Sequence, residues 1–374
     1  MVRVRIARHC IAMICAFLLS SICRAEPGRL ISATEISGAP AGAKAWRIRY
    51  ETSDQAGHVT ESTGILVSPL GAAPKEGRNV IAWAHGTTGI AESCAPSQSP
   101  HAFSSIPSLD QLVGKGWVVV ATDYPGLGTP GPHAYLVGKA AAHAVLDSVR
   151  AARHVPKVNA SSHYIVWGLS QGAHAALFTG EEAHPYAPEL HLVGVAAAAP
   201  PTDLTKNLAA TGNPVVHTIL TAFAAESWSQ VYHADLSTIL SPMKQRVLHR
   251  LAQTCGSEDP ALRTKIQVLR LRDLGKIDLS AIEPWRSLLN TNSAGHQPVG
   301  APLFIAQGTK DVVVSPNVTK QFVDEACKRG ERVRFMSIPD GVHRTTAMAS
   351  STEAIRWMTD LFAGKPASNG CPLN

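Results

Sequence analysis

Residues 164–177 read YIVWGLSQGAHAAL, and this stretch decides the expected fold. Its first half is apolar and rich in β-branched and aromatic residues, as in a buried strand, whereas its second half is rich in small helix-forming residues. The junction, Gly168-Leu169-Ser170-Gln171-Gly172, is the only GxSxG in the chain. A sharp strand-to-helix turn exposes the serine hydroxyl above the sheet edge, and larger flanking side chains would collide with the strand or helix. Ser170 is therefore the candidate nucleophile.

Strands and helices alternate on both sides of this junction. We predict strands at residues 45–51, 63–67, 79–84, 117–122, 163–169, 192–198, 302–307 and 332–338, and helices at 109–114, 138–154, 171–182, 316–328 and 345–362. This alternation predicts an α/β fold with a mostly parallel sheet covered by helices on both faces. The first two strands, with no helix between them, are expected to form an antiparallel pair at the edge.

The alternation stops between Asp203 and Pro298. This stretch is too long for a loop in a compact domain, and it contains helical patches at residues 215–225, 236–252 and 260–271. We interpret about residues 205–298 as a helical cap inserted between two core strands.

Residues 1–25 have the pattern of a signal peptide. Arg3, Arg5 and Arg8 precede an apolar run over residues 10–22, and Ala25 supplies the small residue of a cleavage site. The run is too short to span a bilayer. Removing this leader and its four arginines lowers the net charge from +6 to +2, so composition gives little reason to expect nucleic-acid binding. We expect an exported domain at residues 26–374, periplasmic or extracellular.

A serine nucleophile needs a base, and His343 follows the last predicted strand in the sequence PDGVH. In this type of fold the catalytic residues follow the order serine, acid, histidine. Asp311, in GTKD after the strand at 302–307, is therefore the candidate acid. Its carboxylate would accept the imidazole Nδ1–H, hold the tautomer and stabilise the imidazolium.

Two other aspartates compete with Asp311. Asp203 follows the preceding strand, where some members of the fold place the acid. Asp340 stands close to His343 along the chain, and a turn-forming role suits it better. Position relative to the strands favours Asp311.

An oxyanion hole requires two backbone amides. Gln171, directly after the nucleophile, lies at a helix N-terminus that can face developing negative charge. The second amide is expected from the loop His85-Gly86-Thr87-Thr88-Gly89, with Thr87 and Thr88 both open as donors.

Together these residues resemble the secretory lipase family of α/β-hydrolases. The resemblance is carried by residues 82–97 (AWAHGTTGIAESCAPS), 121–128 (ATDYPGLG), 142–153 (AHAVLDSVRAAR) and 168–177 (GLSQGAHAAL), and by GTKD and GVH. It implies the α/β-hydrolase fold, ester hydrolysis, often of acylglycerols, and a cap over the acyl site. The family's serine, acid and histidine carry over to Ser170, Asp311 and His343. Gln171 departs from the glycine common in some relatives.

Four cysteines remain after the leader, and an even count in an exported chain suggests two disulfides. In the expected layout, a Cys94–Cys255 bridge would join the oxyanion loop region to the cap, and a Cys327–Cys371 bridge would join a helix to the C-terminal tail. No CxxC or clustered Cys/His spacing favours a metal site.

The composition is that of a globular protein, with 45% hydrophobic and 17% charged residues. Residues 126–131 fit GxGxxG, but Pro130 and Pro132 prevent a helix from opening there, so we do not expect a dinucleotide. We predict a secreted serine esterase or lipase, acting through an acyl-enzyme on small-molecule or lipid esters without metal or organic cofactor.

Two alternatives stay open: a serine peptidase or acyltransferase on the same fold, and a secreted binding protein without turnover. Apolar patches of the cap allow a transient contact with a lipid surface. Acyl chain length and oligomeric state are open at this point.

Overall fold

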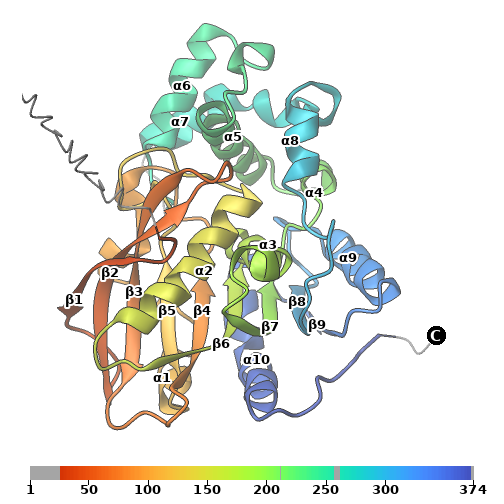
Figure 1. Cartoon of the computed structure of the whole chain (residues 1–374). Helices are drawn as coiled ribbons and strands as arrows, with labels where there is room; N and C mark the ends of the chain where they lie inside the picture. The colour runs from red at the N-terminus through yellow and green to blue at the C-terminus, as the bar shows by residue number, and fades with distance from the viewer. Residues whose placement is uncertain (1–25, 211, 257–261, 372–374) are drawn as a thin grey trace, which may run out of the picture.

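A computed structural model shows the fold and describes residues 26–210, 212–256 and 262–371. Within these residues the centre is one nine-stranded sheet in the order β1-β2-β3-β5-β4-β6-β7-β8-β9 (Figure 1). The strands are β1 (Leu30–Ile36), β2 (Ala43–Ser53), β3 (Val59–Pro69), β4 (Arg78–Ala84), β5 (Val118–Thr122), β6 (Ala160–Leu169), β7 (His191–Ala198), β8 (Leu303–Gly308) and β9 (Val333–Ile338).

The sheet is mostly parallel, as the alternation predicted. Strands β5, β4, β6, β7, β8 and β9 run parallel to one another. Strands β1, β2 and β3 are antiparallel to one another, and β3 is antiparallel to β5. Strand β1 was not predicted, because its residues are exposed or half-buried and give no run of apolar side chains.

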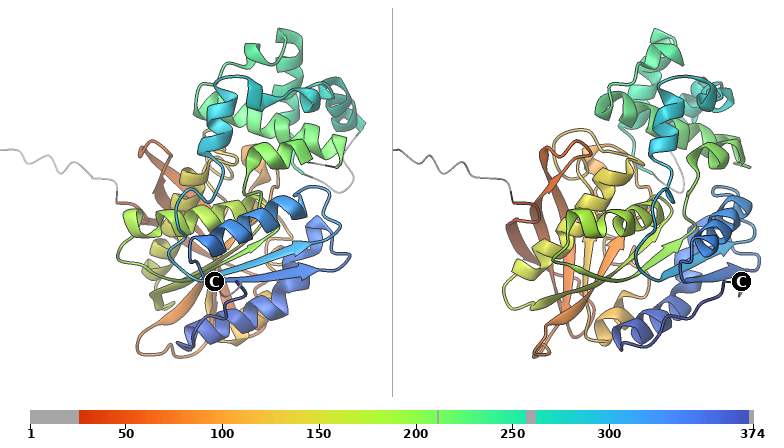
Figure 2. Two further views of the ribbon diagram at one scale, coloured as in Figure 1. Left: turned by 90° about the vertical axis from the view of Figure 1, so that its right-hand side faces the viewer. Right: turned by 45° about the vertical axis from the view of Figure 1, so that its right-hand side comes forward.

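Helices cover both faces of the sheet (Figure 2). The helices α2 (Gly138–His154), α3 (Gln171–Tyr186) and α9 (Pro316–Lys328) contribute to the core on one face, and α1 (Leu109–Gly114) and α10 (Thr346–Phe362) to the core on the other. Successive strand residues point to opposite faces, so Val80 joins the first core and Ile81 the second. Strands buried on both faces read as unbroken apolar runs, which explains the sequence pattern.

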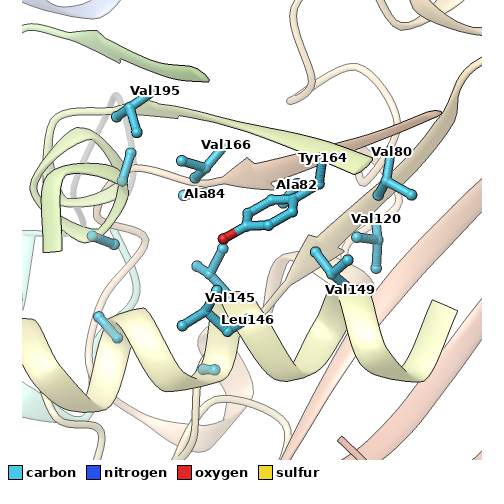
Figure 3. Close-up of a cluster of buried hydrophobic side chains, with 14 of the residues drawn as sticks. Val80, Ala82, Ala84, Val120, Val145, Leu146, Val149, Tyr164, Val166 and Val195 are labelled. Carbon is cyan, nitrogen blue, oxygen red and sulfur yellow. The ribbon is translucent and has the colours of Figure 1, made fainter. Parts of the chain in front are cut away.

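Figure 3 shows part of the first core, where the Tyr164 ring lies between the sheet and helix α2. Val145, Leu146 and Val149 of α2 are fully buried there, facing the valines and alanines of the central strands. Burying one such aliphatic side chain contributes about 1.5–3 kcal/mol to folding. This packing fixes β6, the strand that leads to Ser170.

A helical segment, residues 204–291, lies between β7 and β8 in the chain. Its helices are α4 (Leu204–Ala210), α5 (Pro214–Val231), α6 (Pro242–Ala252), α7 (Leu262–Leu271) and α8 (Trp285–Thr291). They stand at one end of the sheet (Figure 1) and have a core of their own around Trp228, Leu248, Leu271 and Trp285. Tyr135 and Val137, from the segment between β5 and α2, belong to this same core, so the helical segment packs directly against the part of the chain that carries the sheet.

Several predicted boundaries were wrong inside this segment. The patch at residues 236–252 is a short 3-10 turn, Leu236–Thr238, followed by α6, because Pro242 has no N–H and starts a new helix at its first turn. Helices α4 and α8 were not predicted. Of the patch at 260–271, residues 260 and 261 lie outside the described residues, as does the proposed signal peptide at 1–25. No helix in the described part of the chain is long and apolar enough to cross a membrane.

Cys94, Cys255, Cys327 and Cys371 lie in the two expected pairs. Cys94 and Cys255 are joined with a Cα–Cα distance of 5.3 Å, and Cys327 and Cys371 with one of 5.5 Å. The first bridge connects the segment after β4 to the residues just after α6, and the second connects α9 to the C-terminal tail.

Candidate active site

Ser170 stands at the turn between strand β6 and helix α3. Its φ is +55°, a conformation that L-residues rarely adopt, and its N–H donates to the Ala198 carbonyl at 2.9 Å. The glycines of the motif allow this turn through close approach. A Cβ at Gly172 would overlap the Ala84 carbonyl oxygen, and one at Gly168 would overlap the Gly172 carbonyl oxygen. Only glycine lets β6, β4 and α3 meet this closely.

The structure brings Ser170, His343 and Asp311 into one hydrogen-bonded chain. The His343 Nε2 lies 2.8 Å from the Ser170 Oγ, and the His343 Nδ1 lies 2.8 Å from the Asp311 Oδ2. These distances fit an imidazole that donates Nδ1–H to the carboxylate and accepts the serine proton at Nε2. His343 begins a short 3-10 turn after β9, and Asp311 follows β8.

The Asp311 carboxylate is held by several further donors. Its Oδ1 accepts the amides of Val313 at 2.8 Å and Val314 at 2.9 Å, and its Oδ2 also accepts from the Gln307 side chain at 3.0 Å. Burial alone raises the pKa of Asp311, but the hydrogen bonds from His343 and the two amides outweigh it and hold the pKa below its usual value. Asp311 is therefore ionised at neutral pH.

The two competing aspartates point to lysines. Asp340 pairs with Lys310 at 2.8 Å and its side chain is 77% exposed, whereas Asp203 pairs with Lys206 at 3.1 Å. Neither arrangement supplies the buried, multiply hydrogen-bonded carboxylate that orients an imidazole.

The loop after β4 lies against the candidate nucleophile. A Cβ at Gly86 would lie 3.7 Å from the Cβ of Ser170. The next residue, Thr87, has its hydroxyl 3.1 Å from the Tyr135 hydroxyl, whereas the carbonyl of Thr88 accepts the Gly256 amide at 2.7 Å. Thr87 thus contacts Tyr135, a neighbour of Ser170, and Thr88 is tied to the helical segment.

Two residues of this region, His133 and Tyr135, were not singled out from the sequence. The Nε2 of His133 lies 2.9 Å from the Gln171 Nε2, and its Nδ1 lies 3.0 Å from the Pro125 carbonyl oxygen. Burial lowers the pKa of His133 to about 4, so the ring is neutral, donates Nδ1–H to Pro125 and accepts from Gln171. One signal was available, since both residues directly follow the Pro/Gly-rich loop at 125–132.

An apolar cavity adjoins Ser170. Its walls come from the helical segment and from loops that follow the strands. Its lining residues are Tyr135, Leu136, Ser170, Gln171, Pro201, Leu204, Asn207, Leu208, Leu220, Ala224, Trp228, Leu289, Val313 and Val314. A nucleophile beside an apolar cavity suits attack on the carbonyl of a bound acyl group. Among the described residues, no group of three or more His, Cys, Asp or Glu is placed to hold a metal ion.

A family described as secretory lipase matches residues 105–370 of this chain. The chain belongs to the secretory lipase family. The match covers strands β5 to β9, the helical segment and the three residues of the hydrogen-bonded chain, and it confirms the resemblance seen in the sequence.

Relatives in this family are distant. The chain is 24% identical to a secreted triacylglycerol lipase of Malassezia globosa, over 93% of this chain and 78% of that protein. It is 23% identical to lipase 9 of Candida albicans, over 87% of this chain and 75% of that protein. A third relative, 23% identical over 92% of this chain and 80% of its own length, is named a probable inactive lipase of Mycobacterium tuberculosis. Membership of this family therefore does not by itself establish that a protein is catalytically active.

Solved structures confirm the α/β-hydrolase fold. Candida antarctica lipase A in its closed state matches with a TM-score of 0.75 at 20% identity, covering 95% of this chain and 87% of that one. The rice cell wall degrading esterase LipA from Xanthomonas oryzae matches with a TM-score of 0.73 at 18% identity, covering 91% of this chain and 100% of that one.

Proposed function

We propose that this secretory lipase family member is a serine carboxylic-ester hydrolase. The observation that carries the proposal is the hydrogen-bonded chain Ser170–His343–Asp311, with an ionised Asp311, beside an apolar cavity. A binding protein has no need for this arrangement of three residues drawn from three separate loops.

Each step follows from the geometry. The Ser170 Oγ attacks the ester carbonyl while His343 Nε2 takes its proton, and the Gln171 and Thr87 amides stabilise the oxyanion. We assign Thr87 rather than Thr88 because its hydroxyl contacts Tyr135, which lines the cavity with Ser170. His343 then protonates the leaving alcohol, and water, activated by the same imidazole, releases the acid. This cycle uses only side chains and backbone amides of the protein, together with water.

We also propose the domain division. Residues 1–25 act as a signal peptide, residues 26–374 form the hydrolase domain, and about residues 205–298 form a cap over the site. The cap assignment is supported by the cavity, whose walls include residues of α4, α5 and α8. Export is supported by the secreted relatives and by the two cysteine bridges.

A transient contact with a lipid surface is part of the proposal. Helix α7 exposes Leu262, Ile266 and Leu269 at helical spacing, while Val268 and Leu271 are buried on its other side. Its charged residues are the cations Arg263, Lys265 and Arg270. An exposed apolar stripe among cations fits an anionic lipid surface.

Cosedimentation with vesicles tests this contact. We expect Ser170→Ala protein to bind vesicles containing anionic lipid, and a Leu262→Ser/Leu269→Ser variant of it to bind several-fold less. Equal binding of the two proteins would show that α7 does not make the contact.

Hydrolysis of p-nitrophenyl esters, from acetyl to palmitoyl, tests the main proposal. We expect the oxidised mature protein to turn over at least one ester and Ser170→Ala to lose about 10⁴-fold or more in kcat. Ser104→Ala, which changes an exposed serine, is the matched control and should retain full activity. A fluorophosphonate probe should label wild type and the control but not Ser170→Ala.

Two other outcomes would redirect the assignment. Labelling of Ser170 together with amide cleavage and no ester cleavage would favour a peptidase, and acyl transfer to an added alcohol in preference to water would favour an acyltransferase. No labelling and no turnover would favour a binding role.

A further inference from the structure

Tyr135 is held by helix α5 at three points. Its amide donates to the Ser227 hydroxyl at 2.9 Å, and its carbonyl accepts the Trp228 indole N–H at 3.0 Å. Its ring meets the Phe223 ring edge-on, with 6.1 Å between the two centroids. These contacts fix the Tyr135 hydroxyl against the loop after β4, where it meets Thr87.

Burial determines the direction of the hydrogen bond between Tyr135 and Thr87. Tyr135 is only 2% exposed, and burial raises its pKa to about 12, so the phenol keeps its proton at neutral pH. Within the part of the chain that the structure describes, this hydroxyl has one hydrogen-bond partner, the Thr87 hydroxyl at 3.1 Å. A buried donor that lacks an acceptor is costly. Tyr135 therefore donates, and the Thr87 oxygen accepts.

This direction leaves the Thr87 proton for another acceptor. A threonine hydroxyl has one proton and two lone pairs. Because one lone pair is bonded to the phenol, the proton of Thr87 points away from Tyr135. The Thr87 hydroxyl is therefore a donor without a competing acceptor at Tyr135.

Thr87 lies beside the candidate nucleophile. The residue before it, Gly86, is so close to the turn at Ser170 that a Cβ on this glycine would lie 3.2 Å from the Leu169 carbonyl oxygen and 3.7 Å from the Ser170 Cβ. Tyr135, the hydrogen-bond partner of Thr87, lines one cavity with Ser170 and Gln171. The ester oxygen becomes negatively charged in this region, and one residue can offer it both a backbone amide and a hydroxyl.

We propose that the Thr87 hydroxyl is a third donor to the oxyanion, beside the Thr87 and Gln171 amides, and that Tyr135 is a positioning residue that directs the Thr87 proton. The inference rests on the proposed ester hydrolysis and adds a catalytic group to it. No proton is transferred at Thr87 or Tyr135. Both O–H bonds stay intact while the carbonyl oxygen gains negative charge and the hydrogen bond from Thr87 strengthens.

Substitutions that remove one hydroxyl at a time test the proposal. Thr87→Val keeps the amide and the branched shape, and we expect it to lower kcat about 100-fold with KM near wild type, as for the loss of one oxyanion donor. Thr87→Ser restores the hydroxyl and should recover most of this loss. Thr359→Val, which removes a half-buried hydroxyl that donates to the Ile355 carbonyl in α10, is the matched control and should keep full activity.

Tyr135→Phe keeps the ring and removes only the directing hydroxyl. We expect about a tenfold lower kcat in the wild-type background and less than about a twofold change in the Thr87→Val background, because no Thr87 proton then remains to be directed. Additive losses in the double variant would overturn the role of Tyr135. Wild-type kcat in folded Thr87→Val would overturn the role of the Thr87 hydroxyl.

A thionoester with the same acyl chain and p-nitrophenol leaving group separates an oxyanion contact from a displaced loop. Sulfur is a weak hydrogen-bond acceptor, so we expect Thr87→Val and Tyr135→Phe to lose less activity on the thionoester than on the ester. Equal losses on the two substrates would overturn the proposal, since a displaced loop lowers both rates alike. If Thr87→Val fails to fold, Tyr135→Phe on the same two substrates decides. Absence of both turnover and Ser170 labelling in the wild type is a different result, which rejects ester hydrolysis itself and this proposal with it.

Discussion

The carboxyl of Asp311 is subject to two opposing effects, burial and hydrogen bonding. Burial favours the protonated acid, but the bonds from His343, Val313 and Val314 favour the carboxylate and prevail. The site therefore contains a fixed negative charge next to the imidazole, which favours the protonated ring that forms during acylation.

We expect Asp311→Asn to lower kcat by about 10⁴-fold with the fold intact, because the amide can hold the wrong imidazole tautomer. Asp340→Asn, which breaks only a surface pair with Lys310, should change kcat by less than about twofold. Steady-state kinetics on the preferred ester, with circular dichroism to verify folding, measures both. Comparable losses in the two variants would contradict the assignment of the acid.

At the scale of elements, the helical segment is tied to the loop after β4 at two adjacent points. Cys255 is bridged to Cys94, and the Gly256 amide donates to the Thr88 carbonyl at 2.7 Å. The Cys327–Cys371 bridge lies elsewhere, between α9 and the tail. Only the first bridge fixes a loop next to Ser170. Removal of the second bridge is therefore a suitable control for removal of the first.

We expect Cys94→Ser/Cys255→Ser to lower kcat about tenfold or more, because the loop next to Ser170 loses its anchor, and Cys327→Ser/Cys371→Ser to leave kcat near wild type. The bridges span 161 and 44 residues, so their effects on the unfolded chain differ by only about 1 kcal/mol. Denaturant unfolding checks stability and ester hydrolysis checks kcat. Equal kcat values for the two variants would show that the first bridge does not position the loop.

At the scale of the whole molecule, buried ionisable groups make stability depend on pH. Burial lowers the pKa of His133, His143 and His174 to about 4. Between pH 6.5 and 4 the unfolded chain binds protons at these histidines that the folded chain does not, so their contribution to stability falls as pH falls. Asp147 and Glu181 act in the opposite direction, because burial raises their pKa values to about 6 and about 7.

His174→Gln isolates one of these contributions. The His174 Nε2 lies 2.7 Å from the Asn292 carbonyl oxygen, and a glutamine amide can donate there without titrating. We expect the Tm of wild type relative to His174→Gln to decrease steadily from pH 7 to pH 4. His101→Gln, at a surface histidine, should keep a constant Tm difference from wild type. A constant difference for His174→Gln as well would show that its burial does not contribute to acid sensitivity.

The sequence by itself determined the features that depend on local pattern. Unbroken apolar runs predicted the parallel strands, because strands buried on both faces carry no polar alternation. The glycines around Ser170 predicted the strand–helix turn, because other residues would collide there. Asp311 and His343 follow successive predicted strands, and this position predicted that they lie near Ser170. The reason is that the carboxyl ends of parallel strands meet at one edge of a sheet.

Only the tertiary structure decided what depends on side chains distant in sequence. His133 and Tyr135 contact Gln171 and Thr87 through folding alone, and no short motif marks such contacts. The break before Pro242 and the two short helices α4 and α8 depend on packing inside the helical segment rather than on a long apolar period. The cavity volume depends on how Trp228 and Ala224 of α5 pack beside the other residues that line it. Packing is a sum of many non-local contacts, so the size of the cavity beside Ser170 is read from the fold and not from the sequence.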